Sequence, residues 1–495
     1  MSPKLYNSLT RRVEPLETIE PGKVRMYCCG VTVYDRCHLG HARCYIAWDV
    51  VRRYLMWRGY EVRYVQNFTD IDDKILNRAR EEGSSMEEIA ELYTQSYFED
   101  MQRLNVLKAD EYPRATHTID GIKRLIHDLE NKGFAYQSGG DVYYKVRQFS
   151  EYGKLSGRKF DEMQAGASGR VESEEMEAQK KQDPFDFALW KGAKPGEPTW
   201  DSPWGSGRPG WHIECSAMVR ESLGETIDIH CGGADLIFPH HENEIAQSEA
   251  VTGKPLATYW LHNGFVTVNG EKMSKSLGNF TTIRDLLEKI NDPMVVRLLV
   301  LMAHYRKPID FTEEAISAAN NGWNTIKEGL LFGDLYGDRL GWDVDKIEEL
   351  SVGDNEAVGQ FQGAMDDDFN TPGALAVLFE LAKELRRDRN ILIHGGKIET
   401  PGEVLQQKWR TLVSLIKVLG FIKPVQMSAN LDVDDSKGSS EIELSDRDIE
   451  SLIQQRLAAR KAKNFAEGDR IRNELKDRGV TLIDRKDGTT IWHRN

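Results

Sequence analysis

The chain has 495 residues, of which 40% are hydrophobic and 29% charged, and its 65 lysines and arginines against 79 acidic residues give a net charge of −14. This composition excludes a low-complexity chain, and the acidic balance argues against binding a polyanion with the whole surface. The longest apolar run, Pro293–Ala303, is far shorter than the ~20 residues of a membrane helix, and residues 1–22 lack the apolar core of a secretory signal. We therefore expect a folded, soluble, cytoplasmic protein of about three domains.

A strand–helix–strand pattern opens the chain. Val24–Cys29 is rich in β-branched and aromatic residues, Gly40–Met56 has apolar residues at helical spacing, and Glu61–Gln66 again has strand character. This βαβ unit predicts an α/β fold with a Rossmann-like parallel sheet, whose ligands bind at the carboxyl ends of the strands. Strand-like segments at Thr226–His230 and Tyr259–Leu261 predict that the sheet resumes after an insertion.

The pattern along the chain predicts five further boundaries. The Rossmann-like domain would comprise residues 1–111 and 211–282, with a connective insertion at 112–210 where periodicity is irregular. Helical periodicity over 283–425 predicts a helical bundle, the polar stretch 426–442 a linker, and 443–495 a small C-terminal unit. The charge is segregated, because the residues from Gln454 onward include eleven lysines and arginines but six acidic residues.

Some features are expected to carry no chemistry. Gly205–Gly210 matches G-x-G-x-x-G, but no strand-like run precedes it and Pro209 stands where a helix should start, so we expect a loop. Cys37, Cys44 and Cys231 are each expected to be small buried hydrophobic residues, since six cysteines in this context do not form a disulfide framework.

Two short motifs point to phosphate chemistry. His38-Leu39-Gly40-His41 falls at the start of the first predicted helix, where free amide N–H groups attract phosphate and Gly40 leaves room for a flat base. Alone, this motif would indicate only surface histidines at a helix start. Lys272-Met273-Ser274-Lys275-Ser276 follows a turn signal and places two lysines on a polar loop, where they could close over a triphosphate.

Together the two motifs resemble the paired H-I-G-H and K-M-S-K-S signatures of the class I aminoacyl-tRNA synthetases. The resemblance implies that His38, His41, Lys272 and Lys275 are catalytic and stabilise charge on the α-phosphate while an amino-acid carboxylate displaces pyrophosphate. It also implies ATP with Mg²⁺ as a substrate. The implied ATP-binding residues are His38, Gly40, His41, Gly233, Asp235 and Lys275.

Gly233 and Asp235 belong to a glycine-containing segment, Gly232–Leu236, that follows a strand-like run. The glycines would let the backbone approach a ribose, and the Asp235 carboxylate could accept hydrogen bonds from its hydroxyls. A purely structural turn is the alternative for this segment.

Four side chains are candidate metal ligands. His240 and Glu244 are four residues apart on one helical face, and Cys29 and Cys215 lie in remote segments. Two thiols, an imidazole and a carboxylate form a plausible tetrahedral zinc set, although spacing alone cannot bring them together. The pattern differs from the H-E-x-x-H of zinc proteases, because Ile245 stands in the place of the second histidine.

Three longer segments resemble the cysteinyl-tRNA synthetase family: C-G-V-T-V-Y-D from Cys29, W-H-I-E-C-S-A-M from Trp211 and F-P-H-H-E-N-E-I-A-Q-S from Phe238. The adjacent Cys28 departs from the family pattern, but the glycine after Cys29 fixes the register. The resemblance implies one Zn²⁺ per chain and an amino-acid pocket beside it. The implied zinc ligands are Cys29, Cys215, His240 and Glu244, and the implied substrate-binding residues are Cys29, Thr69, Trp211 and His240.

Zinc would serve selectivity. Cysteine and serine differ by one atom, and a pocket that senses shape separates such pairs by about 10²-fold or less, whereas zinc prefers a thiolate to an alcohol. We therefore expect zinc to bind the substrate thiolate and no editing site to be needed. For Trp211 the alternative is a core side chain, and for Asp72 and Asp73 it is helix capping.

The basic C-terminal unit combines lysines and arginines with aromatic side chains, which suits phosphate contact and base stacking, although any solvated amphipathic helix could show this pattern. Its resemblance to the end of the family implies recognition of the tRNA anticodon. The implied contact residues are Arg460, Phe465, Asp469 and Asp484.

The resemblance as a whole implies an enzyme that activates L-cysteine with ATP and transfers it to tRNA(Cys), working as a monomer. The nearest alternative is the cysteine ligase of mycothiol synthesis, which shares the zinc and nucleotide signatures but is shorter and lacks the terminal RNA-reading unit. A catalytically silent RNA-binding paralogue is the alternative from another class, and the intact motifs disfavour it.

Overall fold

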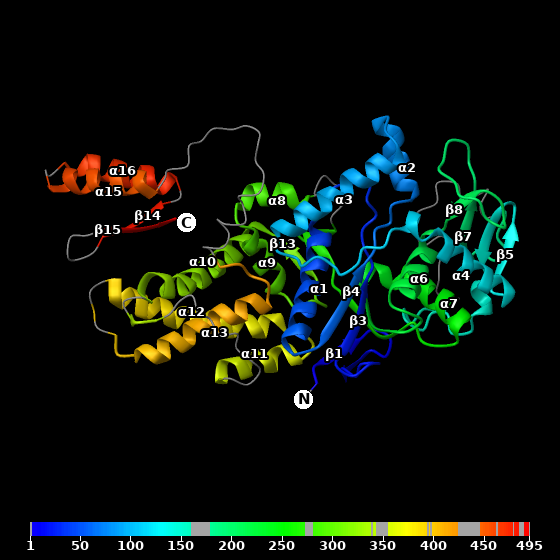
Figure 1. The fold of residues 1–495 in the computed structure, drawn as a ribbon, viewed down its shortest axis with the longest axis horizontal. Coiled ribbons are helices and arrows are strands. Elements are labelled where there is room, and N and C mark those ends of the chain that lie inside the picture. The colour runs from blue at the N-terminus through cyan, green and yellow to red at the C-terminus, as the bar shows by residue number, and fades with distance from the viewer. Residues whose placement is uncertain are drawn as a thin grey trace. The chain divides into compact units, whose positions relative to one another are not determined.

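The computed structural model describes residues 2–159, 179–272, 281–337, 340–342, 355–393, 396, 398–423, 446–461, 464–478, 480–484 and 490–494 (Figure 1). The chain divides into two compact units. The first comprises Met1–Trp323, Glu349–Leu378 and Ser414–Phe421, and the second comprises the rest of the chain. None of the helices in the described ranges combines the length and apolar character needed to cross a membrane.

The first unit is organised around a four-stranded parallel sheet of order β10-β9-β3-β4. β3 (Lys23–Cys28) pairs with β4 (Glu61–Gln66) on one side and with β9 (Ile227–Gly233) on the other, and β9 pairs with β10 (Ala257–Asn263). The predicted parallel sheet and its interruption are therefore confirmed. Because β4 adds on one side of β3 and the later strands add on the other, the strand order reverses between β3 and β9. In open parallel sheets, ligands bind beyond the carboxyl ends of the strands at such a switch point.

α1 (Leu39–Trp57) connects β3 to β4 and is buried along most of its length. His38 caps its first turn, and Gly59, with a φ of 88°, turns the chain toward β4. Asp49 of α1 forms a buried ion pair with Arg297 of α9 (Pro293–Leu301), with both side chains almost inaccessible to solvent. These contacts fix the helix that carries the His38–His41 motif against the rest of the first unit.

The segment between β4 and β9 contains its own antiparallel sheet of order β5-β6-β7-β8. The helices and strands of this segment are α2 (Asp73–Glu82), α3 (Met86–Arg103), η1 (Ala115–His117), α4 (Ile119–Asn131), β5 (Ala135–Ser138), β6 (Asp141–Tyr144), η2 (Val146–Gln148), β7 (Phe187–Gly192), β8 (Gly207–Pro209) and α6 (Trp211–Ser222). Asp72 caps α2 by accepting a hydrogen bond from the Lys74 amide, as one of the two interpretations predicted.

The loop predicted at Gly205–Gly210 is wrong for its second half, where Gly207–Pro209 forms β8 and pairs with β7. The backbone of Gly207 also exchanges two hydrogen bonds with Trp200. A Cβ atom at Gly207 would lie 2.3 Å from the carbonyl oxygen of Lys191, so glycine is required here for close strand pairing. The glycines of this pattern therefore allow close pairing in the antiparallel sheet. Comparison with the phosphate-binding G-x-G-x-x-G motif could not predict this strand.

The remaining elements of the first unit surround the parallel sheet. Its smaller elements are β1 (Lys4–Asn7), β2 (Arg12–Pro15), η4 (Ala234–Leu236), η5 (Ile237–His241), α7 (Glu242–Thr252), β11 (Val266–Val268), β12 (Glu271–Lys272), α8 (Ile283–Ile290) and β13 (Ile309–Phe311). β11 pairs with both β12 and β13, so these strands form a separate three-stranded sheet. β11 and β12 follow β10 directly in the chain, whereas β13 comes after α8 and α9.

The C-terminal part of the chain is mainly helical, as predicted. Its long helices are α10 (Glu313–Tyr336), α11 (Glu356–Asp366), α12 (Thr371–Ile393) and α13 (Gly402–Val418). The terminal elements are α15 (Asp446–Lys461), α16 (Phe465–Asp477), β14 (Val480–Asp484) and β15 (Thr490–Arg494). α15, α16 and β14 share a small apolar core of Ile449, Ile453, Ile471, Leu475, Val480 and Leu482. The predicted linker at 426–442 lies outside the described residues.

Candidate active site

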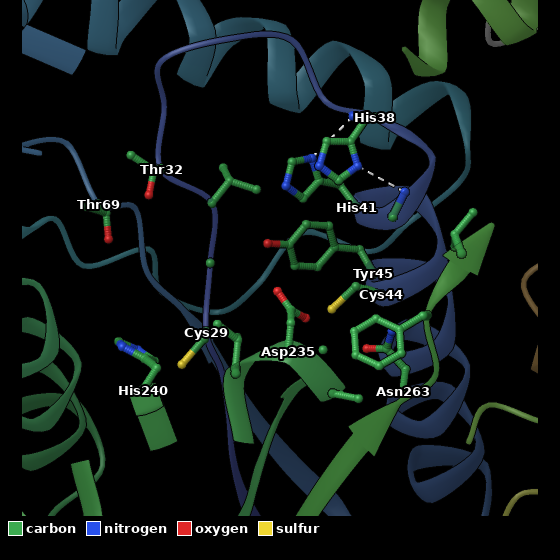
Figure 2. Close-up of a pocket in the computed structure, with 18 of the residues that line it drawn as sticks. Cys29, Thr32, His38, His41, Cys44, Tyr45, Thr69, Asp235, His240 and Asn263 are labelled. Carbon is green, nitrogen blue, oxygen red and sulfur yellow. Dashed lines mark hydrogen bonds between the residues drawn. The ribbon is translucent and has the colours of Figure 1, made fainter. Parts of the chain in front are cut away.

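A pocket of about 720 Å³ opens beyond the carboxyl ends of β3 and β9, at the reversal of strand order. Figure 2 shows Cys29 and His240 on one side of this pocket and His38 and His41 on another. Many of the residues predicted from the sequence line it together. They are Cys29, His38, Gly40, His41, Thr69, Trp211, Cys215, Gly233, Asp235 and His240.

The two motif histidines are held by reciprocal hydrogen bonds at the start of α1. The Gly40 amide donates to Nδ1 of His38 over 3.0 Å, and the His38 amide donates to Nδ1 of His41 over 3.2 Å. The two rings stack with centroids 3.8 Å apart. In both residues Nδ1 is therefore an acceptor, so the hydrogen of each neutral ring is on Nε2.

Both histidines line the pocket, beside the positive end of the helix dipole. Desolvation, reinforced by His38 and Lys74, holds the pKa of His41 well below its ordinary value. His41 is thus neutral near pH 7, and it can donate a hydrogen bond to a phosphate oxygen without a change in protonation.

The segment that precedes the lysine motif reaches the pocket, and the segment that follows it contacts the histidine motif. Lys272 is in β12, which pairs with β11, and Thr267 of β11 lines the pocket. On the other side, Thr282 forms a β-bridge with His38. Lys275 and the side chain of Lys272 lie outside the described residues, so their predicted roles stay predictions.

The four predicted zinc ligands converge, with one ligand atom from each within 4.8 Å of every other. Sγ of Cys29 lies 3.9 Å from Sγ of Cys215 and 3.4 Å from Oε1 of Glu244, while Nε2 of His240 lies 3.0 Å from the same carboxylate oxygen. All four residues are buried. Cys29 follows β3, Cys215 is in α6, and the other two come from η5 and α7.

These separations fit a tetrahedral zinc ion. Zn–S bonds of about 2.3 Å hold two sulfurs about 3.8 Å apart, and Zn–N and Zn–O bonds near 2.05 Å hold those atoms about 3.3 Å apart. The observed values of 3.9 Å and 3.0 Å are close to both. The donor set of two thiols, an imidazole and a carboxylate also suits zinc.

A second set, Cys29, His230, His241 and Glu244, also converges. Of its members, His230 and His241 do not line the pocket, whereas Cys215 and His240 of the first set do. A catalytic metal needs an open side toward its substrate. The first set is therefore the one suited to a metal that meets a ligand in the pocket.

His230 and His241 instead surround the first set. Nε2 of His230 lies 2.9 Å from Oε2 of Glu244, and Nε2 of His241 lies 3.3 Å from Sγ of Cys29. His241 in turn contacts His262 over 2.8 Å. Such outer contacts orient metal ligands. The sequence prediction missed all three residues, and the adjacent His240-His241 pair was the one available signal.

Electrostatics in this cluster favour an ionised carboxylate. Burial alone would raise the pKa of Glu244, but His230 and His240 hold it well below its usual range. Burial would lower the pKa of His240, while Glu244 and Cys215 raise it to about 9. The cluster is therefore a set of mutually stabilised polar groups in a buried position, which a cation can join.

Beside the cluster, Thr69 and Trp211 line the pocket as predicted. The Trp211 ring stacks on the His240 ring at 4.3 Å, so the alternative of a plain core residue does not describe it. A β-bridge joins Thr69 to Thr32, which lies three residues after Cys29. Gly30 packs closely against the backbone of Asn67, and a Cβ atom at Gly30 would lie 1.6 Å from the Asn67 carbonyl oxygen. This contact explains the glycine after Cys29.

Asp235 is exposed at the pocket, and the position of a Cβ atom on Gly233 would lie 2.4 Å from its carboxylate oxygen. The glycine thus leaves space in which the carboxylate can lie over the backbone. Pocket residues that the sequence prediction missed include Thr32, Tyr45 and Asn263 (Figure 2). Thr32 was within reach, since it belongs to the motif that starts at Cys29.

The predicted anticodon residues lie in the second unit, with Arg460 in α15, Phe465 and Asp469 in α16, and Asp484 at the end of β14. Phe465 and Asp469 are one helical turn apart and both exposed, Phe465 to 60%. The Arg460 side chain lies 3.1 Å from the position of a Cβ atom on Gly468. These three residues can therefore share one surface, whereas the side chain of Asp484 lies outside the described part of the chain.

The fold and the pocket together define a class I aminoacyl-tRNA synthetase. Residues 15–321 match the family model of the class I (C) tRNA synthetase catalytic domain, residues 360–423 match a DALR domain, and residues 445–491 match the cysteinyl-tRNA ligase anticodon binding domain. At the level of fold, the Mycobacterium tuberculosis methionyl-tRNA synthetase in complex with methionyl-adenylate is similar, with a TM-score of 0.52, 16% identity, and coverage of 80% of this chain and 89% of that one.

The chain belongs to the cysteinyl-tRNA synthetase family and is an ATP-dependent cysteine–tRNA ligase. It is 68% identical to the cysteine–tRNA ligase of Trichodesmium erythraeum and 66% identical to that of Gloeothece citriformis, with each match covering 100% of both chains. The presence of a matching anticodon-binding domain argues against the shorter mycothiol ligase as the alternative.

Proposed function

We propose that the chain activates L-cysteine with ATP, forming cysteinyl-adenylate and pyrophosphate, and then transfers cysteine to the 3′ end of tRNA(Cys). The observation that supports this proposal is the shared pocket, which is lined both by members of the candidate metal cluster and by the two motif histidines. An amino acid has its side chain and its carboxylate at opposite ends, so it can engage both.

At the phosphate side, His38 and His41 would donate from Nε2 to the α-phosphate as negative charge develops there. Lys272 and Lys275 would bind the triphosphate together with Mg²⁺. Gly40 leaves space for the base beside His38, and Gly233 and Asp235 would bind the ribose. These are positioning and electrostatic roles, in which the protein holds the reactants in line and stabilises the transition state.

At the thiol side, Cys29, Cys215, His240 and Glu244 would hold one Zn²⁺. Bound there, the ion would accept the substrate thiolate, because zinc is borderline-soft and lowers the pKa of a thiol, whereas the hydroxyl of serine is a poor ligand. Serine would then be rejected because its hydroxyl binds zinc poorly, and not because of its size or shape. Trp211 and Thr69 would enclose the rest of the amino acid.

Metal analysis combined with ATP–pyrophosphate exchange tests this proposal. We expect one zinc ion per chain, exchange that depends on cysteine, and no appreciable exchange with serine. Replacing Cys215 with Ala should remove both the zinc and the exchange. Replacing Cys231 with Ala is a matched control, because Cys231 is equally buried and outside the ligand set. Active protein without zinc, or efficient serine activation, would refute the zinc role.

The anticodon contacts of Arg460, Phe465, Asp469 and Asp484 are part of the same proposal. The match of residues 445–491 to an anticodon-binding domain supports them. Cysteine-dependent exchange would also exclude a silent RNA-binding paralogue. The expectations of a monomer and of a cytoplasmic location stay predictions.

A further inference from the structure

Glu214 is a buried acidic residue that directly contacts a side chain of the amino-acid pocket. It is in the first turn of α6, and 1% of its surface is exposed. Its carboxylate oxygen Oε2 accepts a hydrogen bond of 3.1 Å from the hydroxyl of Thr69. Thr69 lines the pocket (Figure 2), whereas Glu214 does not line it. Glu214 can therefore influence a ligand through Thr69.

The hydrogen bond fixes the direction of the Thr69 hydroxyl. A hydroxyl has one donor and two acceptor lone pairs. Since the hydrogen of Thr69 is directed at Glu214, the free lone pairs of its oxygen remain for a donor that enters the pocket. The backbone of Thr69 is fixed beside the pocket, because the Thr69 amide donates to the Val31 carbonyl and the Val33 amide donates to the Thr69 carbonyl.

The surroundings of Glu214 are acidic. Burial and the neighbouring Cys215, Asp72 and Asp70 together raise the pKa of Glu214 well above its ordinary value, and the two aspartates are 7% and 4% exposed. Asp70 is bonded to the amide and hydroxyl of Thr116, and Asp72 accepts from the Lys74 amide. Within the described ranges, no Lys, Arg or His nitrogen comes within 4.0 Å of the Glu214 carboxylate. This side of the pocket thus favours a cation.

The amino-acid substrate brings a cation. In the proposed function its thiolate meets the cluster of Cys29 and His240, and its carboxylate faces the phosphate side at His38. The group that remains is the α-ammonium, which has three N–H donors and needs acceptors. The Thr69 oxygen, adjacent to the Cys29 side of the pocket, is such an acceptor (Figure 2).

We propose that Glu214 is a positioning residue that holds the Thr69 hydroxyl so that its oxygen accepts a hydrogen bond from the α-ammonium group of the amino acid. This inference rests on the proposed function for the placement of the thiolate. It assigns to Glu214 a part in substrate selection without contact between Glu214 and the substrate.

The test compares cysteine with 3-mercaptopropionate, which has the same thiol and carboxylate but no amino group. In Glu214→Gln, the side-chain amide can donate a hydrogen bond to the Thr69 oxygen. The hydroxyl hydrogen of Thr69 would then point into the pocket, where it would repel the α-ammonium group. We expect KM for cysteine in ATP–pyrophosphate exchange to rise by about 10-fold or more, the usual effect of losing a hydrogen bond to a charged group. The inhibition constant of 3-mercaptopropionate and KM for ATP should stay within about 2-fold, because neither ligand uses this contact.

Thr69→Val should show the same selective loss, and adding Glu214→Gln to Thr69→Val should change KM for cysteine by less than about 2-fold, since the two residues act as one unit. Asp186→Asn is a matched control: Asp186 is 3% exposed and accepts a hydrogen bond from the Tyr136 hydroxyl, but it lies in the insertion and does not line the pocket. We expect no selective change in that variant. Zinc content is measured in each protein.

Three results would overturn the inference: equal weakening of cysteine and 3-mercaptopropionate, equal increases in KM for cysteine and for ATP, or additive effects in the double variant. Each would indicate a general structural role for Glu214. If 3-mercaptopropionate does not compete with cysteine in the wild type, the proposed thiolate contact fails instead. The comparison of KM for cysteine with KM for ATP, and the double variant, then still decide the role of Glu214.

Discussion

Replacing His38 by Asn should separate its structural role from its catalytic role. Nδ1 of His38 accepts the hydrogen bond of the Gly40 amide, and this is the capping contact of α1. The amide oxygen of Asn can take the same place, since Asn is among the best N-cap residues. His38→Asn should therefore keep the free energy of unfolding within about 0.5 kcal/mol of the wild type, whereas His38→Ala should lose about 1 kcal/mol.

Both variants lack the imidazole Nε2–H group that the proposal assigns to the α-phosphate. Loss of one donor aimed at developing transition-state charge costs about 2.7–4 kcal/mol, or ~10²–10³ in kcat. We expect kcat of ATP–pyrophosphate exchange at saturating cysteine and ATP to fall by that factor in both variants. The measurement is exchange alongside urea unfolding of the same preparations. Near-wild-type exchange by His38→Asn would contradict the assigned donor role, and a stability loss equal to that of His38→Ala would contradict the capping argument.

Other variants test other parts of the molecule. Gly30→Ala should lower exchange by about 10² or more, because its Cβ would overlap the Asn67 carbonyl and displace the Cys29 segment, and circular dichroism should show that the chain still folds. Asp49→Asn should cost about 3–5 kcal/mol of unfolding free energy at pH 7 by leaving Arg297 buried without its partner. Burial raises the pKa of Asp49, but Arg297 and a neighbouring arginine outweigh burial and bring the pKa below 3.8. The ion pair therefore stabilises the fold above pH 3.8. In urea titrations, the difference in unfolding free energy between Asp49→Asn and the wild type should shrink as the pH falls below that value. Phe465→Ala should leave exchange and stability unchanged but raise KM for tRNA in aminoacylation by about 10-fold, the effect of losing one base stack; an unchanged KM would exclude that contact.

The parallel sheet of the catalytic core could be predicted from the sequence, because its elements have clear hydrophobic periodicity over short stretches of the chain. β3, α1 and β4 each have a clear periodicity, and a βαβ unit has one favoured outcome, a parallel sheet. The motif histidines were also predictable, since His38 and His41 fall where the strand gives way to the helix. Here the local sequence and the global fold agree.

The convergence of the four candidate metal ligands was predictable in a different way. Cys29, Cys215 and the pair His240 and Glu244 come from three remote segments, and their convergence depends on the pairing of β3 with β9 and the packing of α6 against α7. Spacing along the chain does not contain that information. The resemblance to a family supplied it, and in the structure one potential ligand atom from each of the four residues lies within 4.8 Å of the others.

The surrounding histidines could not be found this way. His230 is in β9 and His262 in β10, where each is one of several polar residues in a mainly buried strand and nothing in the spacing marks it. Their relation to Cys29 and Glu244 arises from the register across the sheet. The antiparallel sheet of the insertion was missed for a related reason: its strands are three to six residues long, too short for a reliable alternation of polar and apolar positions.

The end of β3 explains why one pocket can serve two kinds of chemistry. Cys29 is the first residue beyond the strand, Gly30 is clamped against Asn67, and His38 begins α1 nine residues after Cys29. The candidate metal cluster and the histidine motif are thus attached to the same strand, so the proposed thiol and phosphate sites share one support. In an amino acid bound by its side chain, the fold itself would hold the carboxylate near the α-phosphate. The loss of entropy needed to bring the two reacting groups together would then occur when the substrates bind, before the chemical step. A change that loosens this short segment should therefore impair activation more than it impairs the binding of either substrate alone.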